Sequence, residues 1–93
     1  MSVSSYDDMP GMASDADIER LKQLSGVAAE RLFLKLMIAH HEGGIEMAQA
    51  VLPLTDRDEV KMLATTIVNG QMAEIDQMQQ MLADRQGASN QSQ

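Results

Sequence analysis

The two histidines of the chain, His40 and His41, are adjacent and lie between two methionines in a largely apolar stretch. Helix geometry, at about 100° per residue, places five residues of this stretch within an arc of about 120°: Met37, His40, His41, Gly44 and Met47. Two imidazoles and two thioethers would therefore project from one side of such a helix. Imidazole nitrogen and thioether sulfur suit soft metal ions such as Cu(I) and Ag(I). The stretch is therefore a candidate soft-metal site.

A second interpretation of the same residues needs no metal. Methionines at helical spacing commonly fill gaps in a hydrophobic core. Three further polar residues, Glu30, Gln71 and Glu74, fall on the apolar faces of predicted helices, where an unpaired polar group costs about 1–3 kcal/mol. With the two histidines they could form one connected network that fixes how the helices align. They could equally orient histidines that bind a metal, so both interpretations remain open.

The composition narrows the range of functions. The chain has 93 residues, a net charge of −7, nine methionines and only two aromatic residues, Tyr6 and Phe33. A chain of this length forms one domain with a small core, which favours self-association. So acidic a surface argues against binding to nucleic-acid backbones or anionic membranes, and it favours cations as partners.

Several classes of protein are excluded by what the sequence lacks. It contains no cysteine, which excludes disulfides, thiolate zinc sites, iron–sulfur clusters and c-type haem attachment. It also lacks the run of about eighteen apolar residues that spans a membrane. Its polar start, residues 1–8, has no apolar signal-peptide core. We therefore expect either a cytoplasmic protein or a segment of a longer secreted precursor.

The apolar periodicity predicts an all-α chain with three helices. Ser14, with Asp17 three residues later, is expected to cap the first helix, and Ser25 and Gly26 are expected to end it. A proline separates the two long helices, and Thr55 is expected to cap the last one. The expected segments are a flexible arm over 1–14 that carries Met9 and Met12, helices over about 15–24, 27–51 and 56–85, and a disordered tail over 86–93.

The two long helices are expected to form an antiparallel hairpin that turns near Leu54, with Met37 level with residues 70–71. The apolar arc of the second helix spans roughly 200°, wider than the ~100° that faces one neighbour. We therefore expect dimerisation to complete a four-helix bundle. Gly43 and Gly44 together cost about 2 kcal/mol of helix propensity, so we expect them to mark either a close approach of another backbone or a ligand, or simply a weak spot in the helix.

Two groups of residues carry a family resemblance. The first is Met37-Ile38-Ala39-His40-His41 with Ile45-Glu46-Met47-Ala48, and the second is Gln71, Glu74-Ile75 and Met78. With this pattern the chain resembles the domain-of-unknown-function 305 family over roughly residues 9–85. That family comprises small, usually secreted or lipid-anchored bacterial proteins with a ferritin-like helical bundle. The resemblance therefore implies this fold. Two positions depart from its usual pattern: Gly44 replaces alanine and Glu30 replaces aspartate.

The resemblance also implies a function, because the family members studied for function look like copper- and silver-binding proteins of the cell envelope. By this resemblance five residues carry over as metal ligands: Met37, His40, His41, Met47 and Met78. Three polar residues would surround them: Glu30, Gln71 and Glu74. The resemblance further implies a secreted or cell-envelope protein, with its signal segment and any lipid anchor outside this chain.

Three functions are weighed on these residues. The favoured one is a protein that sequesters or delivers Cu(I) or Ag(I) outside the cytoplasm, with the metal ion and a second copy as its partners. The alternative is a metal-free dimeric helical module held in register by its His, Gln and Glu side chains. An enzyme is least favoured, because ferritin-like oxygen chemistry needs Glu-x-x-His pairs. Here Met37 and Ile38 stand three residues before the histidines, so we expect no catalytic site.

Overall fold

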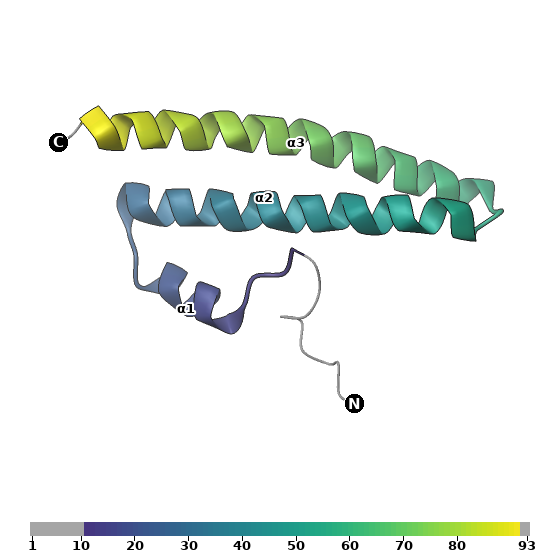
Figure 1. The fold of residues 1–93 in the computed structure, drawn as a ribbon, viewed down its shortest axis with the longest axis horizontal. Coiled ribbons are helices and arrows are strands. Elements are labelled where there is room, and N and C mark those ends of the chain that lie inside the picture. Colours follow the sequence, from purple (N-terminus) through teal and green to yellow (C-terminus); the bar gives the residue numbers. More distant parts are fainter. Residues whose placement is uncertain (1–10, 92–93) are drawn as a thin grey trace.

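The computed structural model describes residues 11–91, and this part of the chain forms three α-helices and no strand. Figure 1 shows α1 (Asp15–Lys22), α2 (Gly26–Val51) and α3 (Asp58–Gln91), with the short 3-10 turn η2 (Leu52–Leu54) between the two long helices. The predicted all-α fold, a hairpin of two long helices preceded by a short one, is confirmed. Within the described range, no helix has the length and hydropathy needed to cross a membrane.

The start of α1 is fixed by a reciprocal cap. The Ser14 hydroxyl accepts a hydrogen bond from the Asp17 N–H at 3.0 Å, and the Asp17 carboxylate accepts one from the Ser14 N–H at 3.2 Å. The predicted N-cap is therefore confirmed. α1 ends at Lys22, before the predicted end at residue 24, because the N–H groups of Gln23 and Leu24 donate to carbonyls three residues back. Such bonds tighten the last turn of a helix.

Three contacts between α2 and α3 define the alignment of the hairpin: Glu30 with Arg85, His41 with Glu74, and Gly44 with Gln71. On both helices the first two contacts are eleven residues apart, and the last two are three residues apart. The antiparallel alignment is therefore regular over the middle of the hairpin.

This alignment differs from the predicted one. We expected Met37 to lie level with residues 70–71, but the observed contacts put it level with Met78. The prediction was wrong because it placed the turn near Leu54. The connection instead includes η2 and the three residues that follow it. Each residue of α2 therefore lies opposite a later residue of α3 than we predicted.

The last helix begins and ends later than predicted. The Thr55 hydroxyl accepts a hydrogen bond from the Arg57 N–H at 3.1 Å, so this residue shapes the connection, and α3 begins at 58 rather than 56. At its other end α3 continues through Gly87 to Gln91, where we expected a disordered tail from residue 86. One glycine costs a helix about 1 kcal/mol, which does not by itself end it. Residues 92–93 lie outside the described range.

The glycine pair of α2 marks two close approaches, which is the first of the two alternatives that we expected. On one side lies Gly11: a Cβ there would be 2.3 Å from the Ala39 carbonyl oxygen and 3.1 Å from Gly43 Cα. Gly11 has a φ of +81°, a left-handed conformation that favours glycine. On the other side the Gln71 amide covers Gly44, where a Cβ would lie 2.7 Å from Gln71 Oε1.

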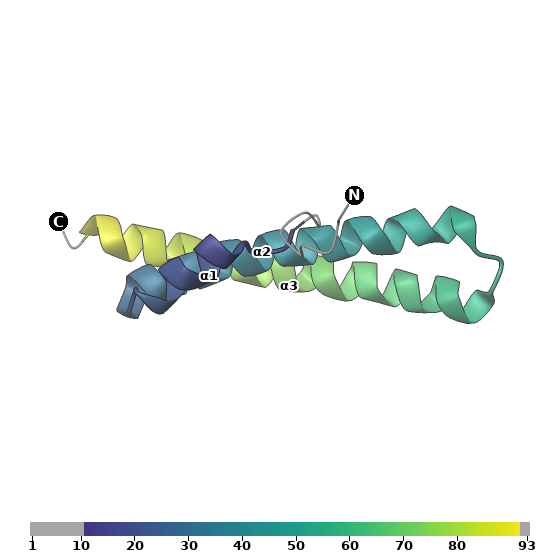
Figure 2. The same ribbon diagram turned by 90° about the horizontal axis from the view of Figure 1, so that it is seen from below.

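The three helices form a single layer. Figures 1 and 2 show them side by side with α2 in the middle, and the molecule measures 55 × 34 × 13 Å. Its radius of gyration is 16.3 Å, against about 12 Å for a compact chain of this length. So thin a layer has little interior, and the buried apolar side chains among the described residues are Leu34, Ala48 and Ala64. Dimerisation into a four-helix bundle remains a prediction.

Candidate metal site

A cavity of about 400 Å³ lies between α2 and the segment that leads into and includes α1; we refer to it as the α1–α2 cavity. Two thioethers and one imidazole line it: Met12, Met37 and His40. The other lining residues are apolar apart from one carboxylate: Ala13, Asp15, Ile18, Leu21, Phe33 and Leu36. The cavity therefore combines soft donor groups with mostly apolar walls.

Met12 reaches this cavity because its neighbour Gly11 lies directly on α2. The Gly11 backbone approaches Ala39 and Gly43, and the Ser14 cap then turns the chain into α1. Together these contacts hold the segment before α1 beside the histidine-bearing part of α2. The sequence left open whether Met9 and Met12 take part in the metal site, because their spacing does not show that Gly11 packs against α2. Met9 lies outside the described residues.

The two histidines point to different neighbours. Their ring centroids are 6.0 Å apart and the ring planes meet at 65°, as suits adjacent side chains about 100° apart around a helix. His40 is exposed and lines the α1–α2 cavity, whereas His41 contacts α3. The sequence leaves this choice open because both residues fall within one apolar arc.

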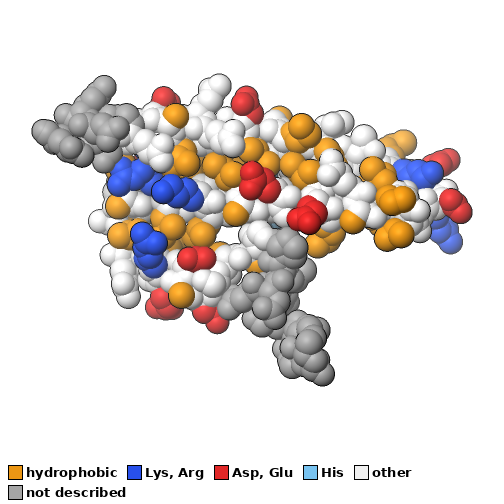
Figure 3. Space-filling model, in the orientation of Figure 1, with side chains coloured by type: hydrophobic (Ala, Val, Ile, Leu, Met, Phe, Trp, Pro, Cys, Tyr) orange, Lys and Arg blue, Asp and Glu red, His pale blue; other side chains and the backbone are white. Residues whose placement is uncertain are grey.

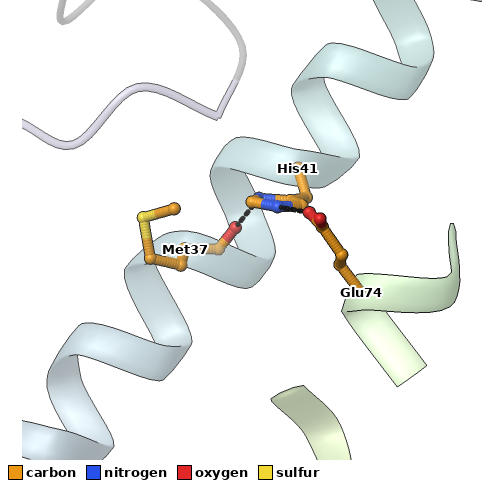
Figure 4. A network of polar contacts seen from close by, with 3 residues as sticks. All are labelled: Met37, His41 and Glu74. Atoms are coloured by element: carbon orange, nitrogen blue, oxygen red, sulfur yellow. Dashed lines mark hydrogen bonds and ion pairs between the residues drawn. The ribbon is translucent and has the colours of Figure 1, made fainter. Parts of the chain in front are cut away.

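The His41 ring is held by two contacts, shown in Figure 4. Its Nδ1 donates to the Met37 carbonyl oxygen at 2.9 Å, and its Nε2 lies 2.5 Å from Glu74 Oε1. A carbonyl oxygen only accepts, so the proton of the first bond belongs to Nδ1, and a second proton must lie between Nε2 and the carboxylate. Both ring nitrogens are therefore occupied, and neither can bind a metal while these contacts last.

The three methionines that the family resemblance implies as ligands do not all line the same surface. In Figure 4 the Met37 side chain points away from His41 and Glu74, consistent with its place in the α1–α2 cavity. Met47 is 60% exposed and lines a groove between α2 and α3. Met78 is half-buried on α3. The structure thus brings Met37 together with His40 and Met12, and it puts Met47 on a different surface.

The polar residues near the histidines make separate contacts rather than one connected network. Arg85 donates through Nε to Glu30 at 2.9 Å and through Nη1 to the Met81 carbonyl oxygen at 3.0 Å. Gln71 lies apart, and within the described part of the chain its buried Oε1 has no hydrogen-bond partner. Glu74 contacts His41. Sequence reasoning missed Arg85 because the predicted alignment paired Glu30 with the wrong level of α3.

The donors around the α1–α2 cavity are neutral sulfur and nitrogen groups, apart from the Asp15 carboxylate. Among residues 11–91, no three His, Cys, Asp or Glu side chains gather closely enough to hold a metal ion. The donor groups that line the cavity beside Asp15 are two thioethers and an imidazole. Thioethers suit soft ions such as Cu(I), whereas hard ions such as Mg²⁺ and Ca²⁺ take oxygen ligands.

Solved structures similar to this chain have the same fold. One is described as "putative secreted protein DUF305 from Streptomyces coelicolor"; it is 42% identical with a TM-score of 0.78, over 83% of this chain and 48% of that one. A DUF305 fragment from Deinococcus radiodurans is 40% identical with a TM-score of 0.78, over 90% of this chain and 55% of that one. The chain therefore spans about half the length of these two proteins.

A family assignment follows from the sequence as well as from the fold. No curated protein matches the chain. The model of the domain of unknown function 305 (DUF305) matches residues 1–82, and both solved structures carry the same domain name. The expected family is confirmed: the chain belongs to the DUF305 family, whose function is unknown.

Proposed function

We propose that this protein binds a soft monovalent metal ion, Cu(I) or Ag(I), in the α1–α2 cavity and sequesters or delivers it outside the cytoplasm. The observation that carries the proposal is the presence of Met12, Met37 and His40 on one cavity. Imidazole binds many metals, but thioether sulfur favours soft ions. Two thioethers with one imidazole therefore form a donor set that selects Cu(I) or Ag(I) over harder cations.

The surroundings of these donors also favour a monovalent cation. Apolar side chains such as Leu21 and Phe33 line the cavity and shield neutral ligands from competing water. The carboxylate of Asp15 lies on the same cavity, and the net charge of −7 attracts cations to the whole molecule. The exposure of His40 leaves an entry path for the incoming ion.

The setting outside the cytoplasm is part of the proposal. A soft-metal site without thiols cannot be lost to disulfide formation in an oxidising compartment, and the chain has no cysteine. The Streptomyces coelicolor relative carries the word secreted in its description. The family resemblance implies the same setting.

In this proposal His41 aligns the helices and does not bind the metal. Its Nδ1 is held by the Met37 carbonyl oxygen within α2, and its contact with Glu74 joins α2 to α3. The metal-free alternative, a helical module held in register by polar side chains, rests on this same contact. Variants of the two histidines therefore distinguish metal binding from the metal-free alternative.

An anaerobic Cu(I) titration against a competing chelator, with native mass spectrometry to count bound ions, tests the proposal. We expect the wild-type chain to take up Cu(I) and His40→Ala to bind it at least about tenfold more weakly, a loss of about 1.4 kcal/mol. His41→Ala should retain binding and instead lower the urea midpoint of unfolding, because Glu74 loses its partner. Binding that is lost in His41→Ala but kept in His40→Ala would refute the assignment.

Methionine variants locate the site more closely. Met12→Leu and Met37→Leu remove the thioether with little change in volume, and each should weaken Cu(I) binding. Met62→Leu is the matched control, since Met62 is 70% exposed and lines neither the cavity nor the groove. Loss of binding in Met47→Leu would favour the larger ligand set that the resemblance implies. A wild-type chain that takes up no Cu(I) would leave the metal-free module.

A further inference from the structure

A groove of about 380 Å³ runs between α2 and α3 in the half of the hairpin nearest the turn; we refer to it as the α2–α3 groove. Its walls are mainly apolar and come from both helices: Met47, Ala48 and Val51 on one side, and Leu63, Ala64 and Ile67 on the other. None of the described residues that line it is charged, although 23% of the chain is charged. The groove therefore differs from the rest of the surface.

Large apolar side chains at the edges of the groove are more exposed to solvent than side chains of a hydrophobic core. Met47 is 60% exposed and Leu63 is 59% exposed. Figure 3 shows hydrophobic side chains along the seam between α2 and α3 and at the turn end of the hairpin. Because the molecule is only 13 Å thick, no second layer of this chain covers them among residues 11–91.

We propose that the α2–α3 groove packs against the same groove of a second copy of this chain, which turns two helical layers into a four-helix bundle. A helix of 26 residues is about 39 Å long, and two adjacent helices are about 20 Å wide. The groove occupies about half of this length, so each hairpin offers a face of about 400 Å² there. That is about half of the ~800 Å² that each partner contributes to a standard stable interface, as suits a dimer that dissociates on dilution.

Chain length favours a second copy as the partner, and the charge of the groove does not prevent it. The net charge of −7 opposes contact between two copies through most of their surface, but the uncharged groove brings no like charges together. In the two solved relatives the matched region is 48% and 55% of the chain. Those proteins thus carry roughly as much chain again beside the matched region, and a second copy of this hairpin would offer the groove an equal amount.

Analytical ultracentrifugation of the whole chain, without metal, tests this proposal. The wild type should sediment at twice the chain mass of 10.2 kDa and dissociate on dilution. Leu63→Lys places a charge in the groove and should give monomers at concentrations where the wild type is dimeric. The matched control is Met62→Lys: the neighbouring side chain is also exposed, at 70%, but lies outside the groove, so this variant should remain dimeric.

Circular dichroism establishes that each variant keeps the helix content of the wild type. Should Leu63→Lys unfold, Met47→Lys repeats the test from α2, with Met72→Lys as its control because Met72 is 56% exposed outside the groove. A wild type that is monomeric at every concentration would overturn the proposal. So would a folded Leu63→Lys dimer, or a Met62→Lys monomer. Since no metal is present, the result is independent of the Cu(I) titration.

Discussion

His41 and His40 differ in what their rings face. His41 uses both, one on the Met37 carbonyl oxygen and one on Glu74, whereas His40 faces a cavity that two thioethers share. The difference comes from the neighbours, α3 for one ring and the segment before α1 for the other. The His41 imidazole is therefore placed to join α2 to α3, and the His40 imidazole is placed to contact a ligand in the cavity.

Gly11→Ala should weaken the proposed metal site without removing a ligand. The residue has a φ of +81°, and its Cβ would lie 2.3 Å from the Ala39 carbonyl oxygen, a backbone atom that cannot move aside on its own. The substitution should therefore push Met12 off α2. We expect its Cu(I) affinity in the chelator competition to fall about as far as that of Met12→Leu.

The control for this prediction is Gly26→Ala. That glycine also has a positive φ, +61°, but no atom lies within 4 Å of its added Cβ. It therefore introduces backbone strain without displacing Met12, and its Cu(I) affinity should stay close to that of the wild type. Equal affinities for Gly11→Ala and the wild type would show that the segment before α1 does not form part of the site.

For the helices, local signals predicted the elements well and their alignment poorly. The Ser14 cap was predictable because its bonds to Asp17 join residues three apart in the chain. The level at which α3 meets α2 was not, because it depends on how many residues the connection uses. Apolar periodicity reports which face of a helix is covered but not which residue lies opposite. The ion pair of Glu30 with Arg85 was missed for that reason. The role of Met12 stayed open for another reason: it depends on how the segment before α1 lies against α2, which its spacing does not report.

Gly44→Ala tests how firmly α2 and α3 are packed at one level. Alanine favours a helix over glycine by about 1 kcal/mol. The atoms that its Cβ would meet, Gln71 Oε1 at 2.7 Å and Nε2 at 2.8 Å, end a flexible side chain, and that buried oxygen has no partner among the described residues. Rotation of Gln71 toward water would relieve both problems, so we expect the free energy of unfolding in urea to rise by up to about 1 kcal/mol.

Gly70→Ala supplies the comparison for this measurement. Gly70 lies in α3 with nothing within 4 Å of an added Cβ, so its variant reports the gain in helix propensity alone. A Gly44→Ala variant that is less stable than the wild type, beside a Gly70→Ala variant that is more stable, would show that the Gln71 side chain is held in place.

In the whole molecule, α2 is the central helix of the layer and carries both proposed surfaces. It forms the α1–α2 cavity with the N-terminal segment and the α2–α3 groove with the last helix. The two surfaces share none of the residues that line them. Metal binding and pairing of copies are therefore separable by mutation, which the variants above exploit.

Pairing of copies should make heat stability depend on protein concentration. When folded chains associate and unfolded chains do not, mass action raises the thermal midpoint as concentration increases. We expect this rise in calorimetry of the wild type, and a lower, concentration-independent midpoint for Leu63→Lys. A wild-type midpoint that stays constant over the dilution series would contradict a dimer.

The two ion pairs between α2 and α3 matter more for their spacing than for their strength. The carboxylates of Glu30 and Glu74 are 53% and 62% exposed, and such exposed pairs contribute only about 0–1 kcal/mol each. Both pairs are eleven residues apart on each helix, so sliding α3 by one turn, about 5.4 Å, would break them together. The two contacts therefore set the alignment of the helices, and they discriminate against alignments that are displaced by a turn.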